Sequence, residues 1–123
     1  MGAYEPKYLY SDVATATASA TITVTNGLGP VLAVSGNGTV APAGADSNAV
    51  VGTAATDAVN GDRVPFFPRG KIHISTAAGA ITAGARVNSA AAGAVASAAA
   101  GLGNIGIALT TAADGAAVEW MEI

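Results

Sequence analysis

The residue best suited to acid–base chemistry in this 123-residue chain is His73, its only histidine. It lies in Lys71-Ile-His-Ile-Ser75, an alternating run typical of a β-strand. With Ile72 and Ile74 directed inward, we expect His73 to point to solvent. A general base also needs an orienting carboxylate and a shaped pocket, and nothing near His73 in the sequence suggests either. We therefore expect no catalytic role for this histidine.

The carboxylates show no spacing typical of a catalytic pair or a calcium loop, in which oxygen ligands recur at fixed positions. The chain also has no cysteine for a thiolate zinc site or a disulfide. We therefore expect no catalytic residue, no metal and no cofactor, and we expect that the protein is not an enzyme. Four aspartates lie in or beside predicted turns, where Asp caps and bends the chain: Asp46, Asp57, Asp62 and Asp114.

A third candidate is Gly101-Leu-Gly-Asn-Ile-Gly106, which matches the glycine pattern of a dinucleotide-binding loop. That fingerprint needs a helix that begins at the loop and an acidic residue about 20 positions later. Here a strand-like run, Ile105–Leu109, takes the place of the helix, and a chain with 16 glycines produces one such match by chance. The glycines also disfavour a long helix, at about 1 kcal/mol each. We interpret residues 81–109 as two strands with their turns.

The overall composition excludes further classes. The net charge is −3, and the five Lys and Arg residues form no basic run, so nucleic-acid binding is not expected. The small, uncharged side chains supply too little transfer energy for a membrane span. Met1–Lys7 lacks the pattern of a signal peptide, so we expect no export. Aromatic residues make up 5% of the chain, and a core of small side chains favours completion against a copy or a larger partner.

An internal repeat indicates how the strands are organised. Gly52 and Gly106 are separated by 106 − 52 = 54 residues, and Phe66 and Trp120 by the same 120 − 66 = 54. Each copy reads as a short strand, a loop, a strand with glycine, a turn and a further strand. The two copies cover about 38–67 and 93–121.

The remaining pattern predicts an all-β fold. Ala14–Thr25 alternates small apolar residues with Thr or Ser, which indicates a strand ended by Asn26-Gly27. We predict a small antiparallel β-barrel or sandwich of two related halves, forming one domain over residues 14–123. Residues 1–13 form an extended amino-terminal arm in this prediction.

The aromatic residues are the candidates for an interface. All three tyrosines lie in the arm, and aromatic anchors are enriched where interfaces bind tightly, so we expect the arm to dock on a partner. The alternative is that the arm packs back onto its own barrel. Pro65 and Pro68 cannot donate ladder hydrogen bonds, which predicts an edge strand or a kinked exit around the two phenylalanines. One Phe is expected in the core and the other at a subunit seam. The predicted interface residues are Tyr4, Tyr8, Leu9, Tyr10, Phe66 and Phe67.

The second half of the chain resembles a known family. The order and spacing of its small-residue motifs resemble the small tailed-phage capsid decoration (cement) proteins, over roughly residues 48–123. The amino-terminal third matches only loosely, at Gly29-Pro-Val31. The motifs are Gly52-Thr-Ala54, Asp57–Asp62, Gly70–Ile74, Thr76–Val87, Ala90–Val95 and Ile105–Leu109.

This resemblance implies a non-enzymatic structural protein on the outer surface of a phage capsid, made in the host cytoplasm. It would bridge major capsid protein subunits, commonly as a homotrimer at three-fold sites. Its arm can add a strand to a capsid sheet edge, and many copies on one shell hold by multivalency. The alternative is a head-surface adhesion module that contacts the host envelope or a glycan.

Overall fold

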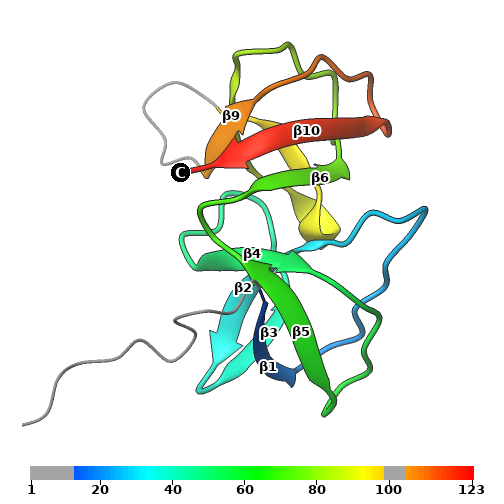
Figure 1. Cartoon of the computed structure of the whole chain (residues 1–123), viewed down its shortest axis with the longest axis vertical. Coiled ribbons are helices and arrows are strands. Elements are labelled where there is room, and N and C mark those ends of the chain that lie inside the picture. The colour runs from blue at the N-terminus through cyan, green and yellow to red at the C-terminus, as the bar shows by residue number, and fades with distance from the viewer. Residues whose placement is uncertain (1–12, 99–104) are drawn as a thin grey trace, which may run out of the picture.

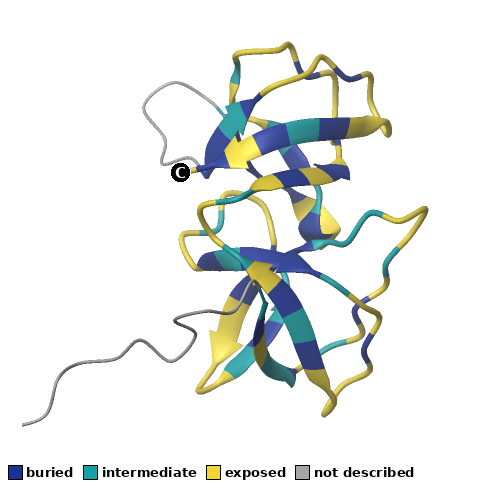
Figure 2. Cartoon of the chain, in the orientation of Figure 1, coloured by how far each residue is buried: buried dark blue, intermediate teal, exposed yellow. Residues whose placement is uncertain are grey.

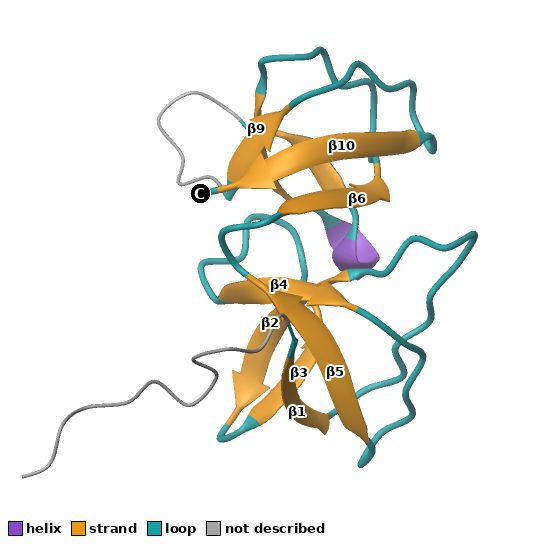
Figure 3. Cartoon of the chain, in the orientation of Figure 1, coloured by secondary structure: helices purple, strands orange, loops and turns teal. Residues whose placement is uncertain are grey.

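The computed structural model describes residues 13–98 and 105–123, which form two β-structures stacked end to end (Figure 1). The first, here called the amino-terminal barrel, contains β1 (Ala14–Ala18), β2 (Val31–Gly36), β3 (Thr39–Pro42), β4 (Val50–Ala54) and β5 (Arg63–Pro68). The second, the carboxy-terminal sheet, contains β6 (Ile72–Thr76), β7 (Arg86–Ser89), the short helix η1 (Ala91–Gly93), β8 (Val95–Ser97), β9 (Gly106–Ala108) and β10 (Ala117–Glu122). The all-β prediction is confirmed (Figure 3).

The two halves share one strand order. The barrel runs β1-β3-β2-β4-β5 and closes by the pairing of β5 with β1; only β1 and β3 are parallel. Followed in the opposite direction round the closed barrel, the same order is β1-β5-β4-β2-β3. The carboxy-terminal sheet runs β6-β10-β9-β7-β8, which is this order with β1 to β5 replaced by β6 to β10 in turn. Its ends, β6 and β8, meet only at a single parallel bridge between Ala77 and Val95. The second half is therefore an incompletely closed version of the first.

The glycines of the repeat lie where two strands approach closely. A methyl group on Gly52 would overlap the Phe67 carbonyl oxygen and lie 3.1 Å from the Phe66 ring. A methyl group on Gly106 would overlap the Met121 carbonyl oxygen and lie 2.6 Å from the Trp120 ring. Only glycine fits at either position, so the 54-residue offset reflects the same packing in both halves.

Figure 2 shows buried positions in the strands of both halves. Their side chains form two clusters, and one of them spans the junction between the halves. Val31, Ala33, Ala43 and Val50 belong to the amino-terminal half, yet they pack with the core of the carboxy-terminal sheet. The junction is therefore an apolar contact rather than a bare linker.

Hydrogen bonds also cross this junction. The Asp46 amide donates to the Ser89 carbonyl at 2.8 Å, and the Gly93 amide donates to the Ala43 carbonyl at 2.9 Å. The Asn88 side-chain amide donates to the Asp46 carboxylate at 3.0 Å. These bonds attach the loop after β3 to β7 and the η1 turn.

The alternating run from Ala14 to Thr25 is a ladder strand only over β1. Beyond Ala18 the contacts become isolated: the Ser19 amide donates to the Val40 carbonyl, Ile22 forms a bridge with Ala58, and the Val24 amide donates to the Asp57 carboxylate. The predicted Asn26-Gly27 turn is confirmed: both residues have positive φ, 54° and 76°, and Thr25 and Leu28 exchange two hydrogen bonds. The prediction of one strand over Ala14–Thr25 was wrong, because only Ala14–Ala18 pairs with other strands over consecutive residues.

Two further predictions need correction. β5 is not an edge strand, because it pairs with both β1 and β4. Its prolines, which lack an amide hydrogen, are tolerated because they lie beyond the ends of the neighbouring strands. The backbone of Pro65 faces Ala55, just past the end of β4, and Pro68 extends past the start of β1. Residues 81–109 contribute three strands, β7, β8 and β9, rather than two. Gly101–Asn104 lies outside the described residues.

The predicted orientation of β6 was also wrong. His73 and Ser75 are buried, at 5% and 0% exposed, whereas Ile72 and Ile74 are 58% and 52% exposed. Strand alternation predicts two faces but not which one is covered, and a shift of one residue exchanges them. The inner face of β6 is polar because β10 supplies polar partners for it, as the next section describes. No helix among the described residues is long and apolar enough to cross a bilayer.

Candidate functional site

The six predicted interface residues fall into three settings. Tyr4, Tyr8, Leu9 and Tyr10 lie outside the described residues. Phe66 is 8% exposed and packs in the core of the amino-terminal barrel. Phe67, the next residue, is 39% exposed and faces the junction between the two halves.

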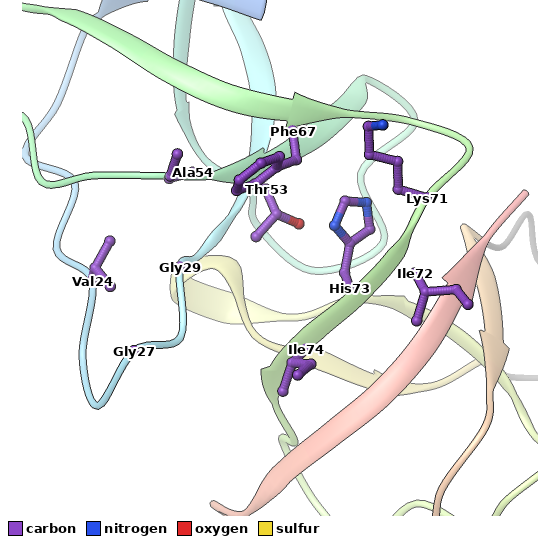
Figure 4. A pocket seen from close by; sticks show the side chains of 11 residues that line it. Val24, Gly27, Gly29, Thr53, Ala54, Phe67, Lys71, Ile72, His73 and Ile74 are labelled. Carbon is purple, nitrogen blue, oxygen red and sulfur yellow. The ribbon is translucent and has the colours of Figure 1, made fainter. Parts of the chain in front are cut away.

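A cavity of about 290 Å³ lies at this junction (Figure 4). Its upper wall is the end of β4 and Phe67 on β5, and its lower wall is the stretch from Lys71 to Ile74 that begins β6. A loop that carries Val24 and Gly29 closes one side. Figure 4 shows the His73 ring directed from β6 into the space between the Thr53 and Lys71 side chains.

Behind the cavity lies a buried polar cluster. His73 Nε2 is 3.6 Å from Glu122 Oε1, and both side chains are almost fully buried, at 4% and 0% exposed. Arg69 Nε lies 3.7 Å from Glu122 Oε2, and its guanidinium also donates to the Ile123 carbonyl. The buried carboxylate thus lies within ion-pair distance of a cation and an imidazole, although neither of its oxygens has a hydrogen-bond partner among the described residues.

The aromatic ring beside this cluster fixes the histidine in place. The rings of Trp120 and His73 lie 5.1 Å apart at an interplanar angle of 44°. Trp120 Nε1 donates to Ser75 Oγ at 2.9 Å, a fully buried bond between directly neighbouring strands. These contacts explain why His73 and Ser75 turn inward. Ser75 accepts a hydrogen bond from the buried indole N–H, which an isoleucine would leave unpaired, and His73 places a polar ring beside the buried carboxylate.

The cluster has three residue types known from hydrolases, namely a hydroxyl, a histidine and a carboxylate. A working arrangement needs the histidine bonded to the hydroxyl on one side and oriented by the carboxylate on the other. Among the described residues, neither Thr53 Oγ1 nor His73 Nε2 has a hydrogen-bond partner. The relay from hydroxyl to histidine is not formed among the described residues. The contacts that are formed attach Arg69, in the segment between β5 and β6, to Glu122 and Ile123 at the end of β10.

A second feature is an exposed apolar surface on the carboxy-terminal sheet. Strand register places Ile72 opposite Met121, and Met121 opposite Ile107, so the three side chains share one face across β6, β10 and β9. Ile74 extends this face along β6, and Met121 is 40% exposed. We call the surface made by Ile72, Ile74, Ile107 and Met121 the outer apolar face. Contiguous exposed apolar side chains of this kind mark sites of protein contact.

Sequence reasoning missed Thr53, Glu122 and Met121. The signal for Glu122 was present in Val118-Glu-Trp-Met-Glu122, where period two places it on the inner face with Val118 and Trp120. A carboxylate on a face with tryptophan indicates a buried partner, which the single histidine supplies. No group of three or more potential metal ligands occurs among residues 13–98 and 105–123.

The architecture defines a class of small all-β proteins: two related five-stranded units stacked through an apolar junction. The same fold is found in the crystal structure of the N base of the head fibre protein gp8.5 from bacteriophage phi29. The likeness has a TM-score of 0.69 at 19% sequence identity, and it covers 90% of this chain and 92% of that one. Neither a protein-family model nor a curated protein sequence matches the chain.

Proposed function

We propose that this protein is a structural component of the outer surface of a phage head, where it decorates the shell and stabilises contacts between major capsid protein subunits. The observation that carries the proposal is the shared fold with the base of a phage head fibre, along nine-tenths of the chain. The small-residue motifs that resemble capsid decoration proteins support the same assignment.

The surface chemistry is consistent with contact as the function. The outer apolar face offers isoleucine and methionine side chains without a cover in the described structure. Glu119 lies on this face opposite Ile74, and Arg86 lies on it opposite Ile107. An interface of standard size covers about 800 Å² on each partner. An apolar sheet face flanked by one charge of each sign is suited to a shell built of many repeated, weak contacts, which multivalency strengthens.

We further propose that the protein acts as a homotrimer, without a cofactor, and that it has no enzymatic activity. The incompletely closed carboxy-terminal sheet and the uncovered outer apolar face both favour association with other chains. The sparse, slightly acidic charge argues against a nucleic-acid partner.

The test is binding to undecorated, expanded capsids. Purified protein is mixed with these particles, and stoichiometry is measured by quantitative gel analysis of sedimented heads, with capsid melting followed by calorimetry. We expect saturable binding and a raised capsid melting temperature. Saturable binding to host envelope or glycan with none to capsids would instead establish the adhesion alternative.

A pair of variants locates the contact. Ile72→Lys places a charge on the outer apolar face, and Val59→Lys places one at an equally exposed position in the amino-terminal half, since both residues are 58% exposed. We expect Ile72→Lys to weaken capsid binding at least about tenfold, the cost of an unpaired charge in an interface. Equal binding by the two variants would remove the outer apolar face from the contact.

A further inference from the structure

The edge of β6 that faces away from β10 is unpaired along most of its length. In the β6–β10 ladder the Glu122 amide donates to the Lys71 carbonyl, and the Ala77 amide donates to the Ala116 carbonyl. Because neighbouring residues of a strand direct their backbone groups to opposite sides, odd-numbered residues of β6 face β10. Ile72 and Ile74 therefore face the other way, where no described residue bonds their amides or carbonyls.

The equivalent edge of the amino-terminal barrel is the side of β1 that faces β3, and it is hydrogen-bonded over more of its length. There the Thr17 amide donates to the Gly38 carbonyl at 3.3 Å and the Ser19 amide to the Val40 carbonyl at 2.9 Å. In the carboxy-terminal sheet, the corresponding bond among the described residues is from the Ala78 amide to the Val95 carbonyl at 2.7 Å, past the end of β6. An open strand edge is a template for a further strand.

A groove follows this open edge. The junction cavity borders the start of β6, and a second cavity, of about 320 Å³, borders its end at Thr76. Both cavities include Gly29, so residues 23–30 form a continuous opposite wall. Val24, Leu28 and Pro30 make that wall largely apolar. The groove thus combines unpaired backbone groups with apolar side walls, which is the chemistry that binds an extended peptide.

We propose that this groove binds the amino-terminal segment of a neighbouring copy of the chain, added as an extra strand on β6. Twelve residues precede Val13, and Pro6 among them lacks an amide hydrogen. The five residues after it, Lys7–Ser11, match β6 in length. Tyr8 and Tyr10 alternate with Leu9, and tyrosine favours strands. Main-chain bonds to Ile72 and Ile74 supply affinity, and the tyrosines supply register.

The donor is a neighbouring copy because β5 separates the groove from the start of the chain's own β1. Phe66 pairs with Ala14 on one side and with Ala54, a wall residue, on the other. Two strand spacings of about 4.8 Å put that wall about 10 Å from Ala14. The three steps from Ser11 to Ala14 span at most about 11 Å, so Ser11 of the same chain reaches that wall only when fully extended. Because β6 lines the cavity separately from this wall, the chain's own Lys7–Ser11 is poorly placed to lie along β6.

Exchange of arms in this way is a head-to-tail contact, which closes into a ring when the rotation between copies allows it. The inference rests on the proposed self-association of copies, but not on capsid binding. Its tests are therefore done in solution without capsids, so that either proposal can fail while the other stands.

The first test uses engineered cysteines, which are unique because the chain has none of its own. Full-length chains with Leu9→Cys and Ile74→Cys, the middle residues of the two segments, are mixed under oxidising conditions, with a mass tag on one chain. We expect a mixed disulfide to form at least about tenfold faster than in a control mixture of Leu9→Cys with Val59→Cys. Equal rates in the two mixtures would overturn the groove as the binding site.

A chain that carries both Leu9→Cys and Ile74→Cys shows whether the bound arm comes from a neighbouring copy or from the same chain. Under dilute conditions, a neighbouring donor gives cross-linked multimers, whereas a donor from the same chain gives an oxidised monomer. The oxidised monomer as main product would overturn the exchange between copies.

The second test addresses the backbone directly. Ile74→Pro removes an amide that faces the open edge and leaves the β10 ladder intact, whereas Ile74→Ala keeps that amide. We expect Ile74→Pro to weaken self-association about tenfold relative to Ile74→Ala, measured by sedimentation equilibrium. Thermal unfolding of both variants verifies the fold. Equal association of two folded variants would contradict strand addition.

Discussion

The amino-terminal barrel and the carboxy-terminal sheet share one strand order and one glycine–aromatic contact, but they differ at their first strands. In the barrel, the inner face of β1 carries Ala14, opposite Phe66. In the sheet, the inner face of β6 carries His73, opposite Trp120. The buried cluster of the barrel consists of apolar side chains, the largest of which are Ile22, Leu32 and Phe66, whereas the sheet also buries a histidine, a serine and a carboxylate.

This difference shows how a repeated fold acquires distinct surfaces. Because polar residues of β6 find partners on β10, its isoleucines are free to face outward. The same strand then presents an apolar face and an unpaired edge, which the barrel's first strand does not do over Thr17–Ser19. The carboxy-terminal half is therefore the one arranged for contact with other chains.

The largest expected effect comes from the aromatic residues of the repeat. Trp120→Ala should lower the free energy of unfolding by about 3–5 kcal/mol, because it empties a fully buried site and leaves Ser75 without its donor. Phe66→Ala should cost less, since Phe66 is slightly exposed and makes no polar bond among the described contacts. Urea unfolding of both variants tests the order. A larger loss for Phe66→Ala would contradict the view that the sheet depends more on its aromatic residue.

The buried carboxylate comes next. Glu122→Ala should destabilise the protein by about 3 kcal/mol, because it leaves His73 and Arg69 without their shared partner. Glu119→Ala is the control: Glu119 lies on the same strand but on the opposite, outer face, and its loss should change stability by less than about 0.5 kcal/mol. Chemical denaturation measures both. Similar small losses would show that the polar cluster does not hold the junction.

The two glycines test whether the repeat is a packing repeat. Gly106→Ala should cost about 2–3 kcal/mol, because the added methyl meets the Met121 carbonyl and the Trp120 ring. Gly52→Ala should cost a similar amount. Gly115→Ala is the matched control: it has φ of +80° but open space around it, so about 1 kcal/mol is expected. Calorimetric melting of the three variants checks the prediction, and it fails if the control is as unstable as the others.

The smallest effect concerns the reversed face of β6. Ile72→Ala should change the free energy of unfolding by less than about 0.5 kcal/mol, because the side chain is mostly exposed in the single chain. An inward isoleucine would cost about 2–5 kcal/mol instead. A loss in the larger range at low protein concentration would restore the orientation expected from the alternating pattern.

Much of the fold could be predicted, and the reason is local. Period-two alternation predicted strands at β1 and β6, the Asn26-Gly27 pair predicted its turn, and the 54-residue offset predicted equivalent glycines. The site was harder to predict. The orientation of β6 depends on what lies opposite it on β10, which is about 45 residues later in the chain, and no local pattern carries that information.

The sequence by itself determined the class of fold, because alternation, turn residues and glycine spacing act over a few residues. It also determined that any core would be built of small side chains. The tertiary structure alone decided which face of β6 is buried, that β5 is an interior strand despite its prolines, and that His73 meets Glu122 at the junction of the two halves. These are properties of strand pairing over long separations, where partners from distant segments determine which side of each strand is covered.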